Sequence, residues 1–495
     1  MLFNSPEFIF LFLPITLIFF YGIARFQAFK SASIFLLIAS IYFYGYWKTE
    51  YIFLLIISVL VNYFLGSIII RCQPSSTKAK TLMWLGIIFD LGILGFFKYF
   101  GFLVENINGI FSLNLQVPQI ILPLAISFYS FTQIAYLVDA YKGEEHISSL
   151  TNYSLFITFF PQLIAGPILR HNQLIPELES KKMFSFSNQS FSVGLMFFIL
   201  GLSKKVIIAD SLSPWVAGIF DNAQSISMIE AWFGAFAYTL QLYFDFSGYS
   251  DMAVGLGKMF NVNIPINFNS PYKASSIADF WRRWHITLSN FLRDYLYIPL
   301  GGNRKGKLRQ YINLMLTMLL GGLWHGAGWT FIIWGGMHGS YLIIHRVFSN
   351  LSINVSVWIA QSITFIAVVF SWVIFRVTSL ADASSYINAM INPRALVLPG
   401  RLEPILGWTS FIGSTFKGSG ISTALPNLPG NTGLLNCINL VSLSILLLIV
   451  FTTRNTNELA ESFRPDLKWT IILGILFSWI VLSFGKGSEF LYFQF

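Results

Sequence analysis

Charged residues are scarce in this chain. Asp, Glu, Lys and Arg make up 11% of its 495 residues, whereas 55% of the residues are hydrophobic. Soluble domains carry about a quarter charged residues, so this deficit excludes a water-soluble protein of this size.

Cysteine is almost absent as well. Cys72 and Cys437 are the only two, and no Cys/His cluster has the spacing of a metal site. We therefore expect no metal ion and no tightly bound cofactor. The sequence also contains no G-x-S-x-G elbow, no phosphate-binding loop and no H-E-x-x-H pair. Serine hydrolases, nucleotide-driven motors and zinc proteases are thus left without support.

Long apolar runs are what the chain has instead. A helix that crosses a bilayer needs about 20 apolar residues, and roughly a dozen runs approach that length. The clearest are residues 8–24, 31–47, 51–70, 82–97, 120–138, 191–208, 231–246, 311–334, 355–375, 434–451 and 469–484. They predict an all-α polytopic membrane protein with one domain over residues 1–495. Residues 392–431, rich in Gly, Pro and Ser, should form an extramembrane loop.

The net charge of +9 does not indicate nucleic acid. Lys and Arg occur in short loops between apolar runs, as topology signals do in membrane proteins. We therefore expect contact with membrane lipid and none with nucleic acid. A basic group that includes Arg304 and Lys305 predicts that the loop after Pro299 faces the cytoplasm.

Two segments are too irregular for plain spanning helices. "ITFFPQLIAGPILRHNQLIPEL" contains Pro161, Gly166, Pro167 and Pro176, and "LLGGLWHGAGWTFIIWGGMHG" is rich in glycine. Proline removes a backbone donor and breaks helices. Irregular backbone at membrane depth is tolerated inside protein or beside a water-filled cavity. We expect re-entrant segments that line such a cavity.

Two histidines are the strongest indication of chemistry. His325, beside Trp324, lies in the glycine-rich segment, and His285 lies in "DFWRRWHITLSNFLRDYLYIPL". Titratable side chains at membrane depth are costly, which favours a functional site. A neutral imidazole suits a general base. The alternative for His325 is a core histidine bonded to a backbone carbonyl. We expect His338 to be structural.

Residues 281–295, taken as one helix, carry polar side chains along one side. These are Arg282, His285, Ser289 and Arg293. Together with the loop that holds Arg304 and Lys305, such arginines could bind the phosphates of a donor. An interfacial helix whose arginines meet lipid phosphates is equally compatible with the pattern.

Two carboxylates interrupt another apolar run. Asp245 and Asp251 lie in "LYFDFSGYSDMAVGLGKMF", and buried carboxylates need partners. We expect Arg282 or Arg283 to pair with one of them, or one of them to orient a histidine.

Four motifs together resemble the membrane-bound O-acyltransferase family, closest to its alginate O-acetylase branch, which also includes peptidoglycan O-acetylation and teichoic-acid D-alanylation proteins. They are "FFPQLIAGPILR", "YFDFSGYSDMAVGLGKMF", "NFNSPYKASSIADFWRRWHITLSNFLRDYLYIPLGGNRKG" and "LLGGLWHGAGWTFIIWGGMHG". The resemblance implies that His325 is the central catalytic histidine and His285 the second conserved polar position. It also implies a ring of helices around a tunnel that joins an acyl donor on one face to an acceptor on the other.

The end of the chain, "GKGSEFLYFQF", carries one more prediction. It is similar to the acyl-accepting tail of the small partner in D-alanylation systems, although a protease-tag remnant must be considered. We predict that Tyr492 carries the acyl group transiently, since a phenol is a better leaving group than a sugar hydroxyl. The alternative is an aromatic anchor at the membrane interface.

The resemblance therefore predicts an O-acyltransferase in a bacterial cytoplasmic (inner) membrane. It would move an acyl group, most simply acetyl, from acetyl-CoA or an acyl-carrier thioester to an exported or cell-wall polysaccharide, with an extracytoplasmic SGNH-type acetyltransferase as partner. Two alternatives stay open. One is a transporter or flippase whose histidines relay protons, and the other is an acyltransferase that modifies lipid or protein.

Overall fold

The computed structural model describes residues 1–164, 166–351, 354–392, 437–484 and 491. In that part of the chain every regular element is a helix, as the sequence predicts. Among the described residues, five helical stretches are long and apolar enough to cross a membrane, and three shorter apolar helices accompany them. The expected dozen spans is therefore not confirmed, because several helices are short or broken.

The helix bounds are as follows. The N-terminal helices are α1 (Leu13–Arg25), α2 (Phe29–Gly45), α3 (Tyr51–Arg71), α4 (Thr77–Leu94), α5 (Phe100–Phe111) and α6 (Ile126–Lys142). The central ones are α7 (Leu150–Thr158), α8 (Phe160–Leu163), α9 (His171–Glu179), α10 (Asn188–Ser203), α11 (Asp210–Phe220), α12 (Met228–Met259), α13 (Ile277–Arg283) and α14 (Ile286–Leu292). The last are α15 (Lys307–His325), α16 (Trp329–Ser349), α17 (Val357–Arg376), α18 (Leu380–Ile391), α21 (Cys437–Thr452), α22 (Thr456–Glu461) and α23 (Leu467–Leu482).

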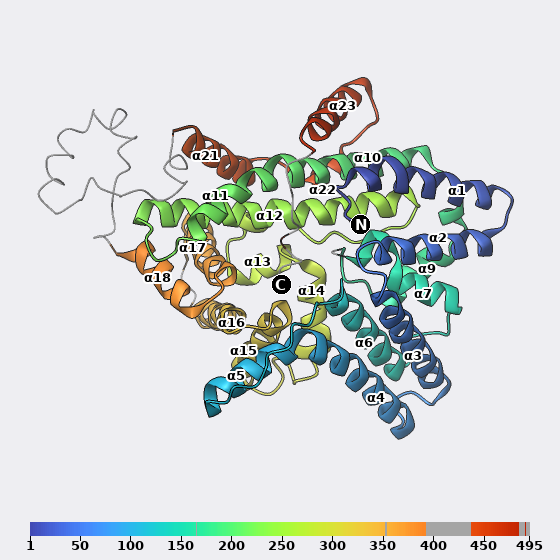
Figure 1. Ribbon diagram of the computed structural model, residues 1–495, viewed down its shortest axis with the longest axis horizontal. Coiled ribbons are helices and arrows are strands. Elements are labelled where there is room, and N and C mark those ends of the chain that lie inside the picture. Colours follow the sequence, from blue (N-terminus) through green and yellow to red (C-terminus); the bar gives the residue numbers. More distant parts are fainter. Residues whose placement is uncertain (165, 352–353, 393–436, 485–490, 492–495) are drawn as a thin grey trace, which may run out of the picture.

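Helix α12 crosses the middle of the molecule, with α10 and α11 along one side of it (Figure 1). Glycines make the contact with α10 possible. A Cβ on Gly201 or Gly248 would lie 2.5 or 2.6 Å from the backbone carbonyl oxygen of the other, and Gly194 and Gly255 form a second such pair. Small residues at these positions let the two backbones touch. The polar side chains of α12 are therefore enclosed by α10 and its continuation.

The carboxylates of α12 pair with lysines from that continuation, a π-helical turn at Lys204–Ala209. Lys205 Nζ lies 2.7 Å from Asp245 Oδ1, and Lys204 Nζ lies 2.6 Å from Asp251 Oδ2. The expected pairing with Arg282 or Arg283 is wrong, because both arginines pair with Asp279 of their own helix. The close glycine contact between α10 and α12 places these lysines, rather than the two arginines, beside the carboxylates of α12.

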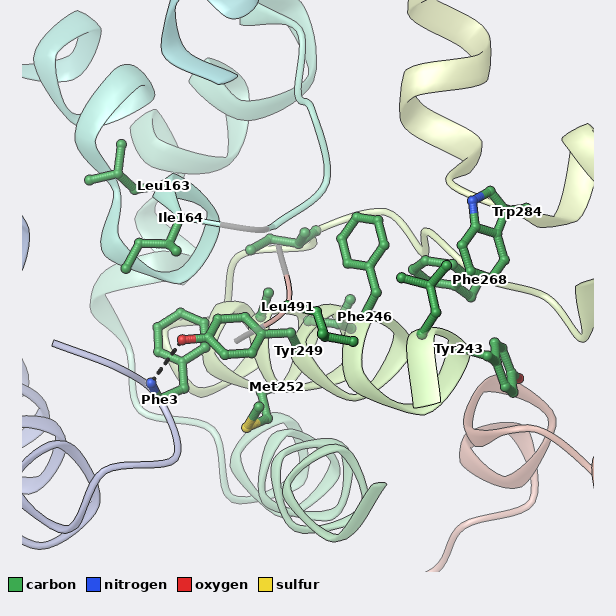
Figure 2. Packing of buried hydrophobic residues seen from close by; sticks show 14 of the residues in the cluster. Phe3, Leu163, Ile164, Tyr243, Phe246, Tyr249, Met252, Phe268, Trp284 and Leu491 are labelled. Carbon is green, nitrogen blue, oxygen red and sulfur yellow. Dashed lines mark hydrogen bonds between the residues drawn. The ribbon is translucent and has the colours of Figure 1, made fainter. Parts of the chain in front are cut away.

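Asp245 also fixes a residue near the end of the chain. The backbone N–H of Leu491 donates to Asp245 Oδ2 at 3.2 Å. The Leu491 side chain is buried in the core beside Phe246 and Tyr249 of α12 (Figure 2). The buried Asp245 carboxylate thus joins α12, the turn after α10 and a segment 246 residues away.

The proline-rich segment is irregular, as predicted. It forms α7, then the single turn α8 with Pro161 in its first positions, and the next helix among the described residues begins at His171. Ile168 and Leu169 in the connection are buried inside the protein. This agrees with the rule that non-helical backbone in such proteins needs protein around it.

His171 begins α9 in a buried polar chain. Its Nδ1 meets the Glu145 carboxylate, and its Nε2 lies 3.3 Å from Ser148 Oγ. The rings of Tyr136 and Phe156 cover the imidazole. The arrangement resembles a serine-hydrolase triad in its residue types. Its enclosure by aromatic rings instead indicates a structural role, in which these contacts hold α9 against the α6–α7 connection.

Residues 281–295 do not form the single helix that the sequence suggested. The chain breaks at His285, which has φ +43° and lies between α13 and α14. A left-handed conformation is uncommon for a residue with a side chain. The proposed row of polar side chains is therefore wrong: Arg282 is 73% exposed, whereas His285 is fully buried.

Candidate functional site

His325 is the last residue of α15, where the chain turns back into α16. Gly322 makes the close α15–α16 contact possible, because a Cβ there would lie 2.2 Å from the Phe331 carbonyl oxygen. The buried His325 ring packs edge-on against Trp324 and Trp334, with centroids 5.0 and 5.1 Å apart. Trp334 in turn contacts His338 at 4.7 Å. His338 accepts a hydrogen bond from Trp281 Nε1 at 3.3 Å, which fits a structural role.

Lys98 and Tyr99 cap the end of α15. The ammonium group of Lys98 donates to the carbonyl oxygens of Trp324 at 2.6 Å and His325 at 3.0 Å. The Tyr99 hydroxyl donates to the Leu323 carbonyl at 2.8 Å. The last carbonyls of a helix have no partner inside it and carry the negative end of its dipole. A cation is therefore well placed here, and it fixes the backbone that carries His325.

Replacing Lys98 by methionine should loosen that backbone. Each buried carbonyl left without a partner costs about 1–3 kcal/mol. A displacement near 1 Å of a reacting group can reduce a rate about 100-fold. We expect a loss of up to that size in any reaction that His325 carries out, with protein that still folds in detergent. Tyr99→Phe, which removes one neutral hydrogen bond, is the control and should cost less. Equal activity of K98M and wild type would contradict a positioning role.

A cavity of about 70 Å³ opens beside His325. Its lining includes Lys98, Ser127, Phe128 and Trp324 as well as His325. It also includes Trp47, two residues after the end of α2, which is 46% exposed, so part of the lining reaches the molecular surface. His325 thus has a space in which a small reactant can reach it.

His285 also contacts Trp324. The Trp324 ring centroid is 6.2 Å from that of His285 and 5.0 Å from that of His325, so one indole contacts both imidazoles. The His285 ring packs edge-on against Phe246 at 4.8 Å, and its Nδ1 lies 3.2 Å from Asn267 Oδ1. The fold therefore brings together two histidines that are 40 positions apart in the sequence.

A second cavity of about 290 Å³ lies against the residues that follow His285. Ile286, Thr287 and Asn290 line it, together with Arg170 and Arg293. Arg293 is 58% exposed, so this cavity is open to solvent.

Asp294 lies between the two arginines of the second cavity. Arg293 donates to it at 2.6 and 3.0 Å, and Arg170 also contacts it. Burial acts to raise the pKa of the Asp294 carboxyl, but the hydrogen bonds from Arg293 and Arg170 hold that pKa below its usual value. With two guanidinium groups and one carboxylate, the mouth of the cavity keeps a positive charge that attracts anions.

An apolar cluster separates the two cavities. Phe128 and Trp324 of this cluster line the first cavity, whereas Ile168 and Phe291 line the second. Phe131 stacks on Phe291 at 4.6 Å and on Trp324 at 5.4 Å. In this structure the two spaces are therefore distinct, and aromatic side chains lie between them.

The predicted site residues lie in different parts of the structure. The structure brings His325, His285 and Trp324 together and places Arg293 at the second cavity. Arg304 and Lys305 are exposed in the turn before α15, and neither they, Arg282 nor Ser289 line a cavity described above. Asp245 and Asp251 are buried on α12 and pair with Lys205 and Lys204 of the turn after α10. Tyr492 and residues 393–431 lie outside the described residues.

The sequence reasoning missed Lys98, Asn267 and Arg170. Arg170 ends the proline-rich motif and Asn267 opens another motif, so both were visible as polar residues in irregular segments. Lys98 was easier to identify as a candidate site residue than these two, since it is a lone cation in the apolar stretch "LGILGFFKYFGFL".

Comparison with known proteins adds the family context. The profile of the membrane-bound O-acyltransferase family matches residues 41–382. A peptidoglycan O-acetyltransferase of Helicobacter pylori is 40% identical over 100% of this chain and 98% of its own length. A probable alginate O-acetylase of Pseudomonas putida is 43% identical over 79% of this chain and 80% of its own. A teichoic acid D-alanyltransferase of Bacillus subtilis is 26% identical over 46% of this chain.

Proposed function

This chain belongs to the membrane-bound O-acyltransferase family, and from that premise we propose that it transfers acetyl groups to a cell-wall or exported polysaccharide. The proposed acceptor class is that of its relatives, which are named for peptidoglycan and alginate O-acetylation. The proposed location is a bacterial cytoplasmic membrane. An extracytoplasmic acetyltransferase of the SGNH type would be the partner that delivers the group to the polymer.

The observation that carries the proposal is the cavity beside His325. A water molecule needs roughly 10–15 Å³ of such space. The 70 Å³ cavity therefore holds about five water molecules. This space beside a buried histidine can hold an acetyl group. We propose a short acyl group rather than a fatty acid because the relatives are named for O-acetylation.

In the proposed reaction, His325 acts as general base. It takes the proton of an acceptor hydroxyl, whose oxygen attacks the thioester carbonyl carbon. A C–O bond forms, the C–S bond breaks, and the thiolate leaves with the electron pair. General bases of this kind contribute about 10²–10⁴ to rate. Lys98 holds the backbone of His325 through the contacts described above.

The donor would enter through the second cavity. Arg170 and Arg293 at its mouth suit a phosphorylated thioester such as acetyl-CoA or a carrier-bound prosthetic group. The two cavities follow one another along α6, since Phe128 lines the first and Ala135 lines the second. Seven residues of helix correspond to about 10 Å. This order supports access for the donor and the acceptor from different ends.

Arg170→Gln combined with Arg293→Gln should weaken donor binding. We expect KM for acetyl-CoA to rise about tenfold or more, with a smaller change in kcat, because charge-assisted contacts to phosphate are worth about 1.5–3 kcal/mol each. The measurement is acetyl-CoA-dependent thiol release by protein in vesicles. Arg282→Gln, which removes an exposed arginine outside the cavity, is the matched control. An unchanged KM in the double variant would contradict this entry site.

The acceptor class is tested in cells. A strain that lacks this chain should lose O-acetyl groups from one extracytoplasmic glycan, as measured by mass spectrometry. Restoration by the wild-type chain is the control. Labelled acetyl groups that appear on lipid or protein instead would overturn the proposal.

A further inference from the structure

We infer that Asn267 is a positioning residue that holds His285 in the tautomer with its proton on Nδ1, so that Nε2 presents a lone pair. The catalytic consequence of this arrangement rests on the proposed function. The tautomer itself does not, because the hydrogen bonds around Asn267 determine it.

The orientation of the Asn267 side chain is fixed without reference to the histidine. Its Oδ1 position lies 3.1 Å from the backbone nitrogen of Thr287. A backbone N–H can only donate, so the atom that faces it must be the amide oxygen rather than the amide nitrogen. The Thr287 hydroxyl also points to this oxygen, at 3.0 Å.

The Thr287 hydroxyl is fixed in the same way. Its oxygen accepts a hydrogen bond from the backbone N–H of Ile168 at 2.9 Å. Its own proton is then directed to Asn267 Oδ1. The network therefore runs from the proline-rich segment through Thr287 to Asn267. In each of its hydrogen bonds, only one of the two groups can be the donor.

The imidazole of His285 completes the network. Its Nδ1 lies 3.2 Å from the same Asn267 Oδ1. An amide oxygen has no proton to give, so Nδ1 must be the donor. A neutral imidazole carries one N–H, and Nε2 is then an acceptor. His285 and Asn267 are both fully buried, which leaves bulk water no route to compete with this bond.

The backbone around His285 is held by the same residue. The N–H of Ile286 donates to the backbone carbonyl of Asn267 at 3.0 Å. Asn269, two residues further on, donates its N–H to the Arg283 carbonyl at 2.9 Å. These bonds on both sides of His285 support its φ of +43°. Asn267 thus fixes both the position of the His285 ring and the ring nitrogen that carries its proton.

A consequence follows for the role of His285. A neutral ring with its proton on Nδ1 cannot donate from Nε2, so it cannot polarise a thioester carbonyl through that atom. Any hydrogen bond between Nε2 and a reactant must then be one that Nε2 accepts from an N–H or O–H group. In serine proteases, loss of the residue that fixes a histidine tautomer costs about 10⁴ in kcat, so the effect on rate can be large.

The test is ¹⁵N NMR of histidine-labelled protein in nanodiscs. The chain has six histidines, and the His285 signals are assigned by their loss in His285→Gln. In wild type we expect a protonated Nδ1 and an unprotonated Nε2. Asn267→Leu should shift the ring toward the Nε2–H form, whereas Asn267→Asp, which keeps an oxygen acceptor, should retain Nδ1–H. Asn269→Leu is the matched control, since its side-chain oxygen accepts from Asn455 instead.

Acetyl transfer should follow the tautomer. We expect at least a tenfold lower kcat for N267L with little change in donor KM, and substantial rescue in N267D. A wild-type spectrum with the proton on Nε2, or an unchanged tautomer in N267L, would overturn the inference, and the first of these needs no variant that might misfold. The expected tautomers without any acetyl transfer by wild type would count against the proposed function and leave this inference standing.

Discussion

Replacing His325 by alanine should reduce acetyl transfer by about 10²–10⁴-fold, the contribution typical of a general base. The side chain lines the cavity and makes packing contacts with Trp324 and Trp334. Alanine leaves the backbone that Lys98 caps intact, because those hydrogen bonds go to carbonyl oxygens. The measurement is the O-acetyl content of glycans from a deletion strain that carries the variant, with expression checked in detergent extracts.

The control for H325A is His345→Ala. His345 lies near the end of α16 and lines neither cavity described above. It should support wild-type acetylation. A folded H325A protein that keeps full activity would remove His325 from the mechanism. A folded H325A protein that still moves acetyl groups but has lost dependence on a proton gradient would favour the transporter hypothesis.

Replacing Lys205 by methionine should destabilise the protein by about 3–5 kcal/mol, the typical cost of breaking a buried ion pair. Lys205 Nζ lies 2.7 Å from both Asp245 and Asp210, and its side chain is almost fully buried. Without it, the Asp245 carboxylate remains charged in an enclosed core. Of the contacts described above, it then keeps only the hydrogen bond from the Leu491 N–H. We expect a strong fall in thermal stability and in the yield of monodisperse protein after extraction.

The matched control for K205M is the double variant K205M/D245N. Asparagine keeps an oxygen acceptor for the Leu491 N–H but carries no charge. Replacing both members of a buried pair by neutral groups is often close to neutral in stability. The double variant should therefore recover the part of the loss that comes from the unpaired Asp245 charge. A double variant as unstable as K205M would show that lost packing or the lost Asp210 pair, rather than the Asp245 charge, is responsible.

Segments with an unusual backbone carry much of the chemistry. Lys98, Lys205 and Arg293 each lie in a π-helical turn, at Gly95–Tyr99, Lys204–Ala209 and Arg293–Tyr297. Such turns are rare and often occur at functional sites. Here each turn directs a cation from an otherwise apolar or interfacial helix toward a carbonyl, a carboxylate or a cavity. This placement explains how a chain with so few charges can assemble a polar centre.

The sequence by itself determined the class of the protein. Apolar runs are a local property, so they predicted the helices, and the scarcity of charge predicted the membrane. Proline and glycine act on their own backbone, so the broken segments around Pro161 and His325 could also be predicted. His325 and His285 were identified for the same reason, since a titratable group in an apolar run is visible without any partner.

Only the tertiary structure decided which groups meet. Lys98 is 226 positions from Trp324, and Arg170 is 124 positions from Asp294. The partners of Asp245 were predicted wrongly because the choice between Lys205 and the arginines depends on a glycine contact between α10 and α12. The break at His285 depends on Asn267, which lies 18 positions earlier. Hydrogen bonds and ion pairs act over about 3 Å, so their partners are set by how the helices pack and not by their order along the chain.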